Sequence, residues 1–147
     1  MRKIYFVCTG NTCRSPMAQA LANQYFKTGK CDMLAYSRGI MTTNLKASKY
    51  AVSAMKDYGL DISGHVSMSI KYEDLENADK VITMTKEHKQ YINQNFSGFD
   101  DKIYTLGEVA GTSADVTDPF GASFEIYLQC ANQINELLCL YFKEYKI

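Results

Sequence analysis

Short runs of apolar and β-branched residues recur along the chain, separated by segments with helical spacing. Residues 3–7, 33–37, 80–84 and 102–106 form such runs, most of them flanked by polar or turn-forming residues. Continuous apolar runs of this length are typical of buried strands in parallel sheets. The pattern therefore predicts four strands.

The first predicted helix has clear signals at both ends. Ser15 is expected to be its N-cap and Pro16 suits its first helical position, while Gly29 closes it. A second helix is predicted over residues 47–58, where apolar side chains share one face and Gly59 follows. The chain thus opens as strand, tight loop and helix.

Two further helices complete the pattern. Thr85 is expected to cap the third, with His88 at its capping-box position and on the helix surface. The last helix has one apolar stripe, formed by Tyr127, Cys130, Ala131, Ile134, Leu137, Leu138 and Tyr141. Strands that alternate with helices indicate an α/β fold with a mainly parallel sheet. Without a repeat, linker or composition break, residues 1–147 are expected to form one domain.

Charge and hydropathy exclude several classes of function. The 147 residues carry 16 Lys+Arg and 16 Asp+Glu, so the formal net charge is 0. A neutral chain lacks the electrostatic surface of a nucleic-acid binder. No apolar run reaches the roughly 18 residues of a membrane span. We therefore expect a cytoplasmic protein with no nucleic-acid partner and no membrane association.

The five cysteines are an odd number, which argues against the disulfide framework of a secreted protein. Cys31, Cys130 and Cys139 are expected to be buried as small hydrophobic residues. Cys8 and Cys13 differ, because they lie in the loop between the first strand and the first helix. In open parallel sheets, ligands bind at such strand ends.

This loop, residues 8–15, has the features of an anion-binding site. Successive backbone N–H groups before a helix form a nest for an anion, and the helix dipole adds positive charge. Gly10 is expected to allow the tight curve, Asn11 tolerates left-handed backbone, and Arg14 can grip two phosphate oxygens. The residues expected to surround a phosphate are Thr9, Gly10, Asn11, Thr12, Cys13, Arg14 and Ser15.

Cys8 is the candidate nucleophile of this loop. The helix N-terminus and the Arg14 guanidinium favour a thiolate at Cys8. A thiolate beneath a bound phosphoryl group is placed for in-line attack, which gives a phosphocysteine intermediate. The Ser15 hydroxyl could donate to that thiolate. The alternative is a tight turn that holds a buried cysteine and a surface arginine.

Asp118 is the candidate general acid and base. It precedes Pro119, which forces extended geometry on it and ends any strand or helix. Beside the apolar Phe120, its carboxylate could be partly desolvated and so reach a useful pKa. The alternative is that Asp118 only initiates a turn.

Together, the 8–15 loop, the Pro16-Met17-Ala18 segment and Asp118-Pro119 resemble the low-molecular-weight protein tyrosine phosphatases. The resemblance runs along the whole chain. It implies a flavodoxin-like domain with four parallel strands in the order 2-1-3-4, helices on both faces, and no metal or cofactor. It also implies that Cys8 is the nucleophile, that Arg14 binds phosphate, and that Asp118 is general acid and then base.

Further residues are carried over from the same family. Asn11 resembles its loop-organising asparagine, Ser37 a buried supporting serine, and His65 the histidine of the same hydrogen-bond network. His65 could instead be a solvated loop residue. Arg38 departs from the family, which usually has small residues there, and it lines the site entrance or faces water.

Two positions resemble a narrower branch, the protein arginine phosphatases. Thr12 stands where tyrosine phosphatases usually carry an aliphatic residue, and Phe120-Gly121 where many carry two aromatic residues. A hydroxyl at position 12 can bond a guanidinium nitrogen, which an aliphatic side chain would leave unpaired at a cost of about 1–3 kcal/mol. Neutral drift between residues of similar volume is the alternative. We expect phosphoarginine in a protein as substrate, with phosphotyrosine as the alternative.

Three other functions fit parts of the pattern. An arsenate reductase needs a further redox cysteine pair, whereas Cys130 and Cys139 lie nine residues apart in the last helix. A non-catalytic phosphate-binding module would not need Cys8 and Asp118. A zinc site made of Cys8, Cys13 and the histidines lacks the usual ligand spacing. Inorganic phosphate or another oxyanion is expected to bind the loop as an inhibitor.

Cys13 suggests redox control. It shares the loop with Cys8, so it could resolve an oxidised Cys8 as a reversible disulfide. The alternative is that Cys13 packs beneath the loop.

Overall fold

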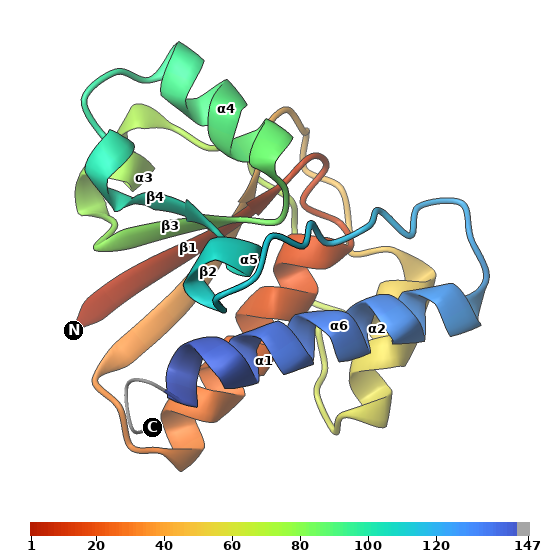
Figure 1. Ribbon diagram of the computed structural model, residues 1–147. Helices are drawn as coiled ribbons and strands as arrows, with labels where there is room; N and C mark the ends of the chain where they lie inside the picture. Colours follow the sequence, from red (N-terminus) through yellow and green to blue (C-terminus); the bar gives the residue numbers. More distant parts are fainter. Residues whose placement is uncertain (144–147) are drawn as a thin grey trace.

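The structure, a computed structural model, describes residues 1–143 (Figure 1). Its strands are β1 (Arg2–Cys8), β2 (Met33–Gly39), β3 (Lys80–Thr83) and β4 (Ile103–Thr105). Its helices are α1 (Arg14–Thr28), α2 (Lys49–Asp57), α3 (Tyr72–Asn77), α4 (Lys86–Asn95), α5 (Leu106–Val109) and α6 (Phe124–Lys143), with a 3-10 turn at Asp100–Lys102. The last four residues of the expected domain, 144–147, lie outside the described part.

The four strands form one parallel sheet in the order β2-β1-β3-β4, which confirms the predicted topology. β1 lies inside the sheet, where Cys8 is opposite Gly39 at the end of β2. All carboxyl ends therefore meet at one edge, and the loop after β1 lies there.

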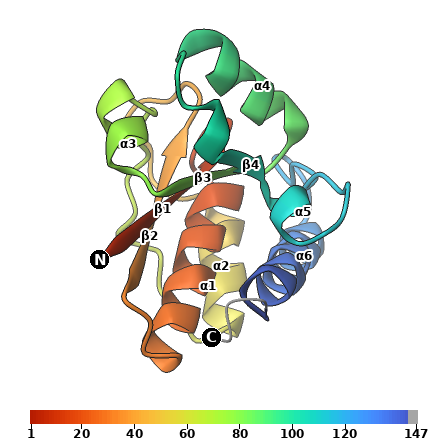
Figure 2. The same cartoon turned by 60° about the vertical axis from the view of Figure 1, so that its left-hand side comes forward.

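Helices cover both faces of the sheet, as the resemblance implies (Figures 1 and 2). Alternate side chains of β1 point to opposite faces. Ile4 and Phe6 join the core beneath α1, α2 and α6, whereas Tyr5 and Val7 join the smaller core beneath α3 and α4. Because both faces are covered, β1 is apolar without alternation over residues 4–8.

The start of α1 differs from the prediction. The helix begins at Arg14 with Cys13 as its N-cap, and no side chain caps it. Ser15 lies inside the first turn, so its assignment as N-cap was wrong. The short helices α3 and α5 were not predicted, because six and four residues carry little periodic signal.

The last helix matches its predicted stripe. All seven apolar residues named for it are buried in α6. In the described residues 1–143, no helix is both long and apolar enough to cross a bilayer.

Candidate active site

Cys8 ends β1 and is almost fully buried at the base of the loop. The end of β2 lies directly beside this loop, since the amide of Ile40 donates to the carbonyls of Cys8 and Thr9. A Cβ on Gly39 would lie 2.8 Å from the Thr9 carbonyl oxygen. Glycine at position 39 is therefore required for the close approach of β2 to the loop.

Asn11 organises the loop from a fully buried position. Its backbone is left-handed, with φ of 56°, as its residue type allows. Its side-chain amide donates to Ser15 Oγ at 2.8 Å, and its Oδ1 accepts from the Met68 amide at 2.9 Å. His65 Nε2 donates to the Asn11 carbonyl at 2.7 Å. Gly10, in contrast, is not in the left-handed region, so the curve is made at Asn11.

Ser15 links this network to the candidate nucleophile. Its Oγ lies 2.9 Å from Cys8 Sγ and 3.3 Å from the carbonyl oxygen of Arg38. Because Oγ accepts from Asn11, its one proton is directed to the Cys8 sulfur or to the Arg38 carbonyl oxygen. Ser15 is the second residue of α1, past the N-cap position, and its side chain contacts Cys8 from there.

Arg14 reaches the loop from the first turn of α1 and is buried. Its Nη1 donates to the Val116 carbonyl at 2.9 Å, and its Nη2 donates to Thr9 Oγ1 at 3.5 Å. Its Nη2 also lies 3.7 Å from Asp118 Oδ2. Hence the guanidinium lies between the loop and the segment that carries Asp118.

Asp118 is more exposed than expected. Its side chain is 53% exposed, and its Oδ1 accepts from the backbone amide of Phe120 at 3.1 Å. The Phe120 side chain is itself 77% exposed and does not enclose the carboxylate. The expected desolvation of Asp118 by Phe120 is therefore absent.

Cys8, Arg14 and Asp118 line one cavity of about 480 Å³. The segment that carries Asp118 crosses near the amino end of α1 in Figure 1, where Val116 and Asp118 contact Arg14. The cavity residues come from the loop, from the segment after β2 and from the segment before α6: Cys8, Thr9, Gly10, Thr12, Cys13, Arg14, Met41, Thr42, Thr43, Leu45, Asp118 and Phe120. The topology thus brings the two predicted motifs together.

The other predicted residues lie around the loop at different distances. His65 is half-buried, and this burial lowers its pKa. Ser37 is buried, but its hydroxyl donates to Gln19 Oε1 at 2.6 Å and not to the loop. Arg38 neither lines the entrance nor faces water, because its Nε pairs with Asp74 Oδ2 at 3.0 Å.

His88 was wrongly expected on the helix surface. It is 7% exposed, and its Nε2 lies 2.8 Å from Thr9 Oγ1. Burial, followed by the nearby Arg14 charge, lowers the pKa of His88 to about 4. Ile92, four residues later and fully buried, marks the inner face of α4 and was the signal that could have found it.

Cys13 Sγ points into the protein, 3.3 Å from Ser48 Oγ and 3.5 Å from the hydroxyl of Tyr127 on α6. The redox role of Cys8 and Cys13 stays a prediction.

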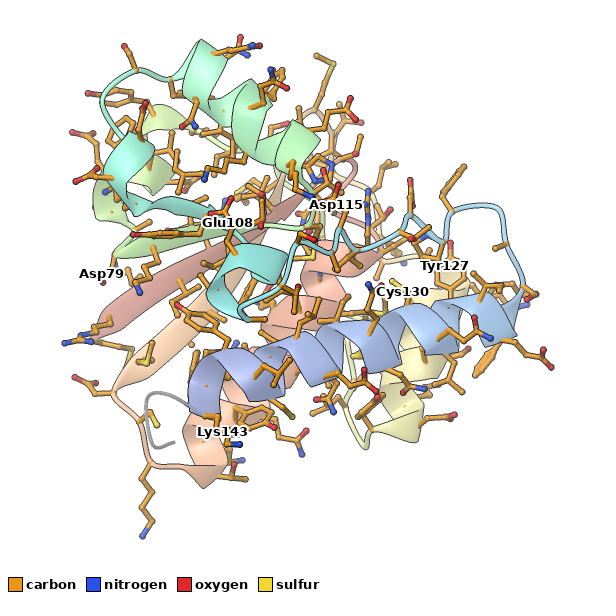
Figure 3. All side chains as sticks on the ribbon, viewed as in Figure 1. Asp79, Glu108, Asp115, Tyr127, Cys130 and Lys143 are labelled. Carbon is orange, nitrogen blue, oxygen red and sulfur yellow. The ribbon has the colours of Figure 1, made fainter. Side chains whose placement is uncertain are left out.

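The other three cysteines differ in burial. Cys130 is buried, and its Sγ lies 3.7 Å from the carbonyl oxygen of Thr117. Figure 3 shows Cys130 on the side of α6 nearest the segment that carries Thr117. Cys31 and Cys139 are only half-buried, contrary to expectation. Within residues 1–143, no three His, Cys, Asp or Glu side chains are grouped to hold a metal ion.

Comparison with known proteins gives consistent matches over the whole site. The family model described as low molecular weight phosphotyrosine protein phosphatase matches residues 3–146. A protein-arginine-phosphatase of Bacillus subtilis is 43% identical over 137 residues, which cover 92% of this chain and 91% of that protein. The low molecular weight protein-tyrosine-phosphatase PtpB of Staphylococcus epidermidis is 36% identical, with coverage of 92% and 94%.

A solved structure shows the same fold with a covalent phosphoryl group. It is the YwlE arginine phosphatase, in a variant with serine in place of a cysteine and with a phosphorylated active-site serine. The TM-score is 0.94 at 40% identity, with 98% of this chain and 95% of that chain covered.

Proposed function

The chain belongs to the low molecular weight phosphotyrosine protein phosphatase family, and we propose that it hydrolyses phosphoarginine in proteins. The observation that carries the proposal is the convergence of Cys8, Arg14 and Asp118 on one cavity. A nucleophile, a phosphate ligand and an acid are the three groups that phosphoryl transfer through an enzyme nucleophile needs.

In the first step, the Cys8 thiolate attacks phosphorus while Arg14 and the N–H groups of residues 9–15 hold the phosphoryl oxygens. The new bond is S–P, and the bond that breaks is P–N of phosphoarginine. Asp118 donates its proton to the leaving guanidino nitrogen. The Ser15 hydroxyl, 2.9 Å from Cys8 Sγ, stabilises the thiolate before attack.

In the second step, Asp118 is a carboxylate and takes a proton from a water molecule. The water oxygen attacks phosphorus, the S–P bond breaks, and inorganic phosphate leaves together with the regenerated Cys8 thiolate. The exposed position of Asp118 supports this role, because the carboxylate has access to solvent.

Thr12 supports phosphoarginine as the substrate. It lines the cavity, where its hydroxyl can accept from a guanidinium N–H that an isoleucine would leave unpaired. The higher identity to the arginine phosphatase than to the tyrosine phosphatase agrees with this. Phosphotyrosine is the second candidate, favoured by the exposed apolar side chains of Met41, Leu45 and Phe120 at the cavity.

The test compares turnover of free phosphoarginine and of a phosphotyrosine peptide, with Cys8→Ser as the blank. The wild type is expected to prefer phosphoarginine, and Thr12→Ile to reduce that preference about 10-fold to 100-fold. Thr43→Ile makes the same change elsewhere on the cavity wall, and it is expected to keep the wild-type preference.

A wild-type preference for phosphotyrosine would assign that substrate and make Thr12 incidental. Turnover of neither substrate above the Cys8→Ser blank would contradict catalysis and favour a phosphate-binding module.

A further inference from the structure

His88 is a buried polar residue outside the catalytic trio. It lies in the first turn of α4, where its backbone amide donates to Thr85 Oγ1 at 3.1 Å. The side chain therefore leaves a fixed point of the backbone and reaches across to the loop of β1 and α1. Its Nε2 contacts Thr9, 79 residues away in the sequence.

The imidazole is costly to bury at this position. His88 Nδ1 is buried with no hydrogen-bond partner, and within residues 1–143 only Asn93 Oδ1 shares that condition. An unpaired buried polar atom destabilises the fold, and an apolar side chain would avoid that cost. The contact of His88 Nε2 with Thr9 is therefore the best explanation for a histidine at this position.

The Nε2 atom begins a short chain of contacts. It lies 2.8 Å from Thr9 Oγ1, which accepts from Arg14 Nη2 at 3.5 Å. The other terminal nitrogen of Arg14, Nη1, is held by the Val116 carbonyl at 2.9 Å. Thr9 and Val116 thus restrain the two terminal nitrogens of one guanidinium.

We propose that His88 is a positioning residue, which holds the Arg14 guanidinium through the Thr9 hydroxyl in the orientation that receives a phosphoryl group. The proposal rests on the proposed function in one respect, namely that Arg14 binds phosphate. His88 itself does not touch the substrate, because Thr9 stands between its ring and the cavity.

The contact between His88 and Thr9 suits a neutral imidazole in either tautomer. With its proton on Nδ1, the ring accepts from the Thr9 hydroxyl through Nε2; with the proton on Nε2, it donates to Oγ1. In both tautomers Oγ1 keeps a lone pair for the Arg14 N–H. A protonated ring would add a second positive charge beside Arg14. Burial and Arg14 lower the pKa of His88, while Asp118 and Asp115 oppose this (Asp115 is labelled in Figure 3).

Two substitutions of His88 separate this role from a general packing role. The side-chain amide of His88→Gln reaches about as far as Nε2, whereas that of His88→Asn reaches only about as far as Nδ1. Thr9→Val removes the hydroxyl at constant shape. Ile92→Ala is the matched control, since it lies one helical turn further on the buried face of α4.

Each variant is assayed for the Kd of inorganic phosphate and for kcat and KM with phosphoarginine. His88→Asn and Thr9→Val are expected to weaken phosphate binding about 10-fold, the size of one lost hydrogen bond to a charged network. The same two variants should lower kcat/KM. His88→Gln is expected to retain binding within about twofold, and Ile92→Ala to lower the melting temperature with unchanged Kd.

The double variant of Thr9→Val and His88→Asn should bind phosphate no more weakly than Thr9→Val alone, because both break one chain of contacts. The proposal is overturned if the two losses multiply, if His88→Gln behaves as His88→Asn, or if Ile92→Ala weakens phosphate binding equally.

The phosphate Kd keeps this proposal separate from the enzymatic one. Wild-type phosphate binding without turnover would contradict the proposed phosphatase function and leave the His88 result valid. Absence of phosphate binding by the wild type would overturn the His88 proposal itself.

Discussion

The two halves of the cavity wall are built differently. On the phosphate side, the buried Cys8 and Arg14 line the cavity. Behind this wall, the buried Asn11 donates to Ser15, whose hydroxyl contacts Cys8. On the outer side, Met41 and Phe120 are each 77% exposed, and Leu45 is 54% exposed. The phosphate half is fixed before a ligand arrives, whereas the outer half faces open solvent.

Because of this difference, the two halves are expected to contribute differently to catalysis and to substrate affinity. Dipoles and charges that are already oriented stabilise a transition state without reorganisation, and this is where a catalytic site gains most. Exposed apolar side chains contribute contact area and little orientation. Changes on the phosphate side should therefore affect the chemical step, and changes on the outer side should affect the affinity for the remainder of the substrate.

The largest expected effect comes from Arg14→Lys. A lysine keeps the charge but loses the planar fork that contacts Val116 and Thr9 together, so kcat/KM should fall about 100-fold to 1,000-fold. Arg38→Lys is the matched control, because Arg38 pairs with Asp74 of α3 and does not line the cavity. Equal losses of kcat/KM in the two variants would show that the phosphate half is no more sensitive than the rest.

An intermediate effect is expected on stability below neutral pH. The pKa of His88 is about 4 in the fold and 6.5 ordinarily, so the unfolded chain binds a proton that the folded chain does not. The contribution of His88 to stability is complete above pH 6.5 and is lost as the pH falls toward 4. The slope approaches about 1.4 kcal/mol per pH unit.

Urea denaturation at pH 7, 6 and 5 measures this for the wild type and His88→Gln. Between pH 7 and pH 5, the free energy of unfolding should fall less in the variant than in the wild type. The charged residues around position 88, Arg14, Asp115 and Asp118, are the same in both proteins. Parallel curves would mean that His88 is not the group that titrates.

The smallest effect is expected from Phe120→Ala. The side chain is exposed, so the free energy of unfolding should change by less than about 0.5 kcal/mol. The KM for a phosphorylated peptide should rise about twofold to threefold, while the Kd of inorganic phosphate stays constant. A change in the phosphate Kd would contradict the division into two halves.

Much of the fold follows from local pattern. β1 is a continuous apolar run, and α6 has a single apolar stripe at helical spacing. Both elements were therefore predicted to within a few residues. The short elements α3 and α5 were missed because their residues are fixed by tertiary contacts and not by periodicity.

The site divides in the same way. Cys8, Asn11 and Arg14 could be placed at this loop from sequence, because a strand end, a tight loop and a helix start impose recognisable residue types. Ser15 was wrongly expected to cap the helix, because sequence spacing does not show that its hydroxyl contacts Cys8, Asn11 and the Arg38 carbonyl. The spacing of His88 and Ile92 could have placed His88 on the buried face of α4, but no local pattern shows that this face meets the loop.

Val116 joins Arg14 to the segment that carries Asp118 through its backbone. Its carbonyl accepts from Arg14, and its amide donates to the carbonyl of Met84 at the end of β3. This buried residue therefore pins an exposed segment that carries Asp118 two positions later. Arg14 and the segment that carries Asp118 therefore share one anchoring residue, so a substitution that displaces the Val116 backbone would disturb the candidate phosphate ligand and the candidate acid together.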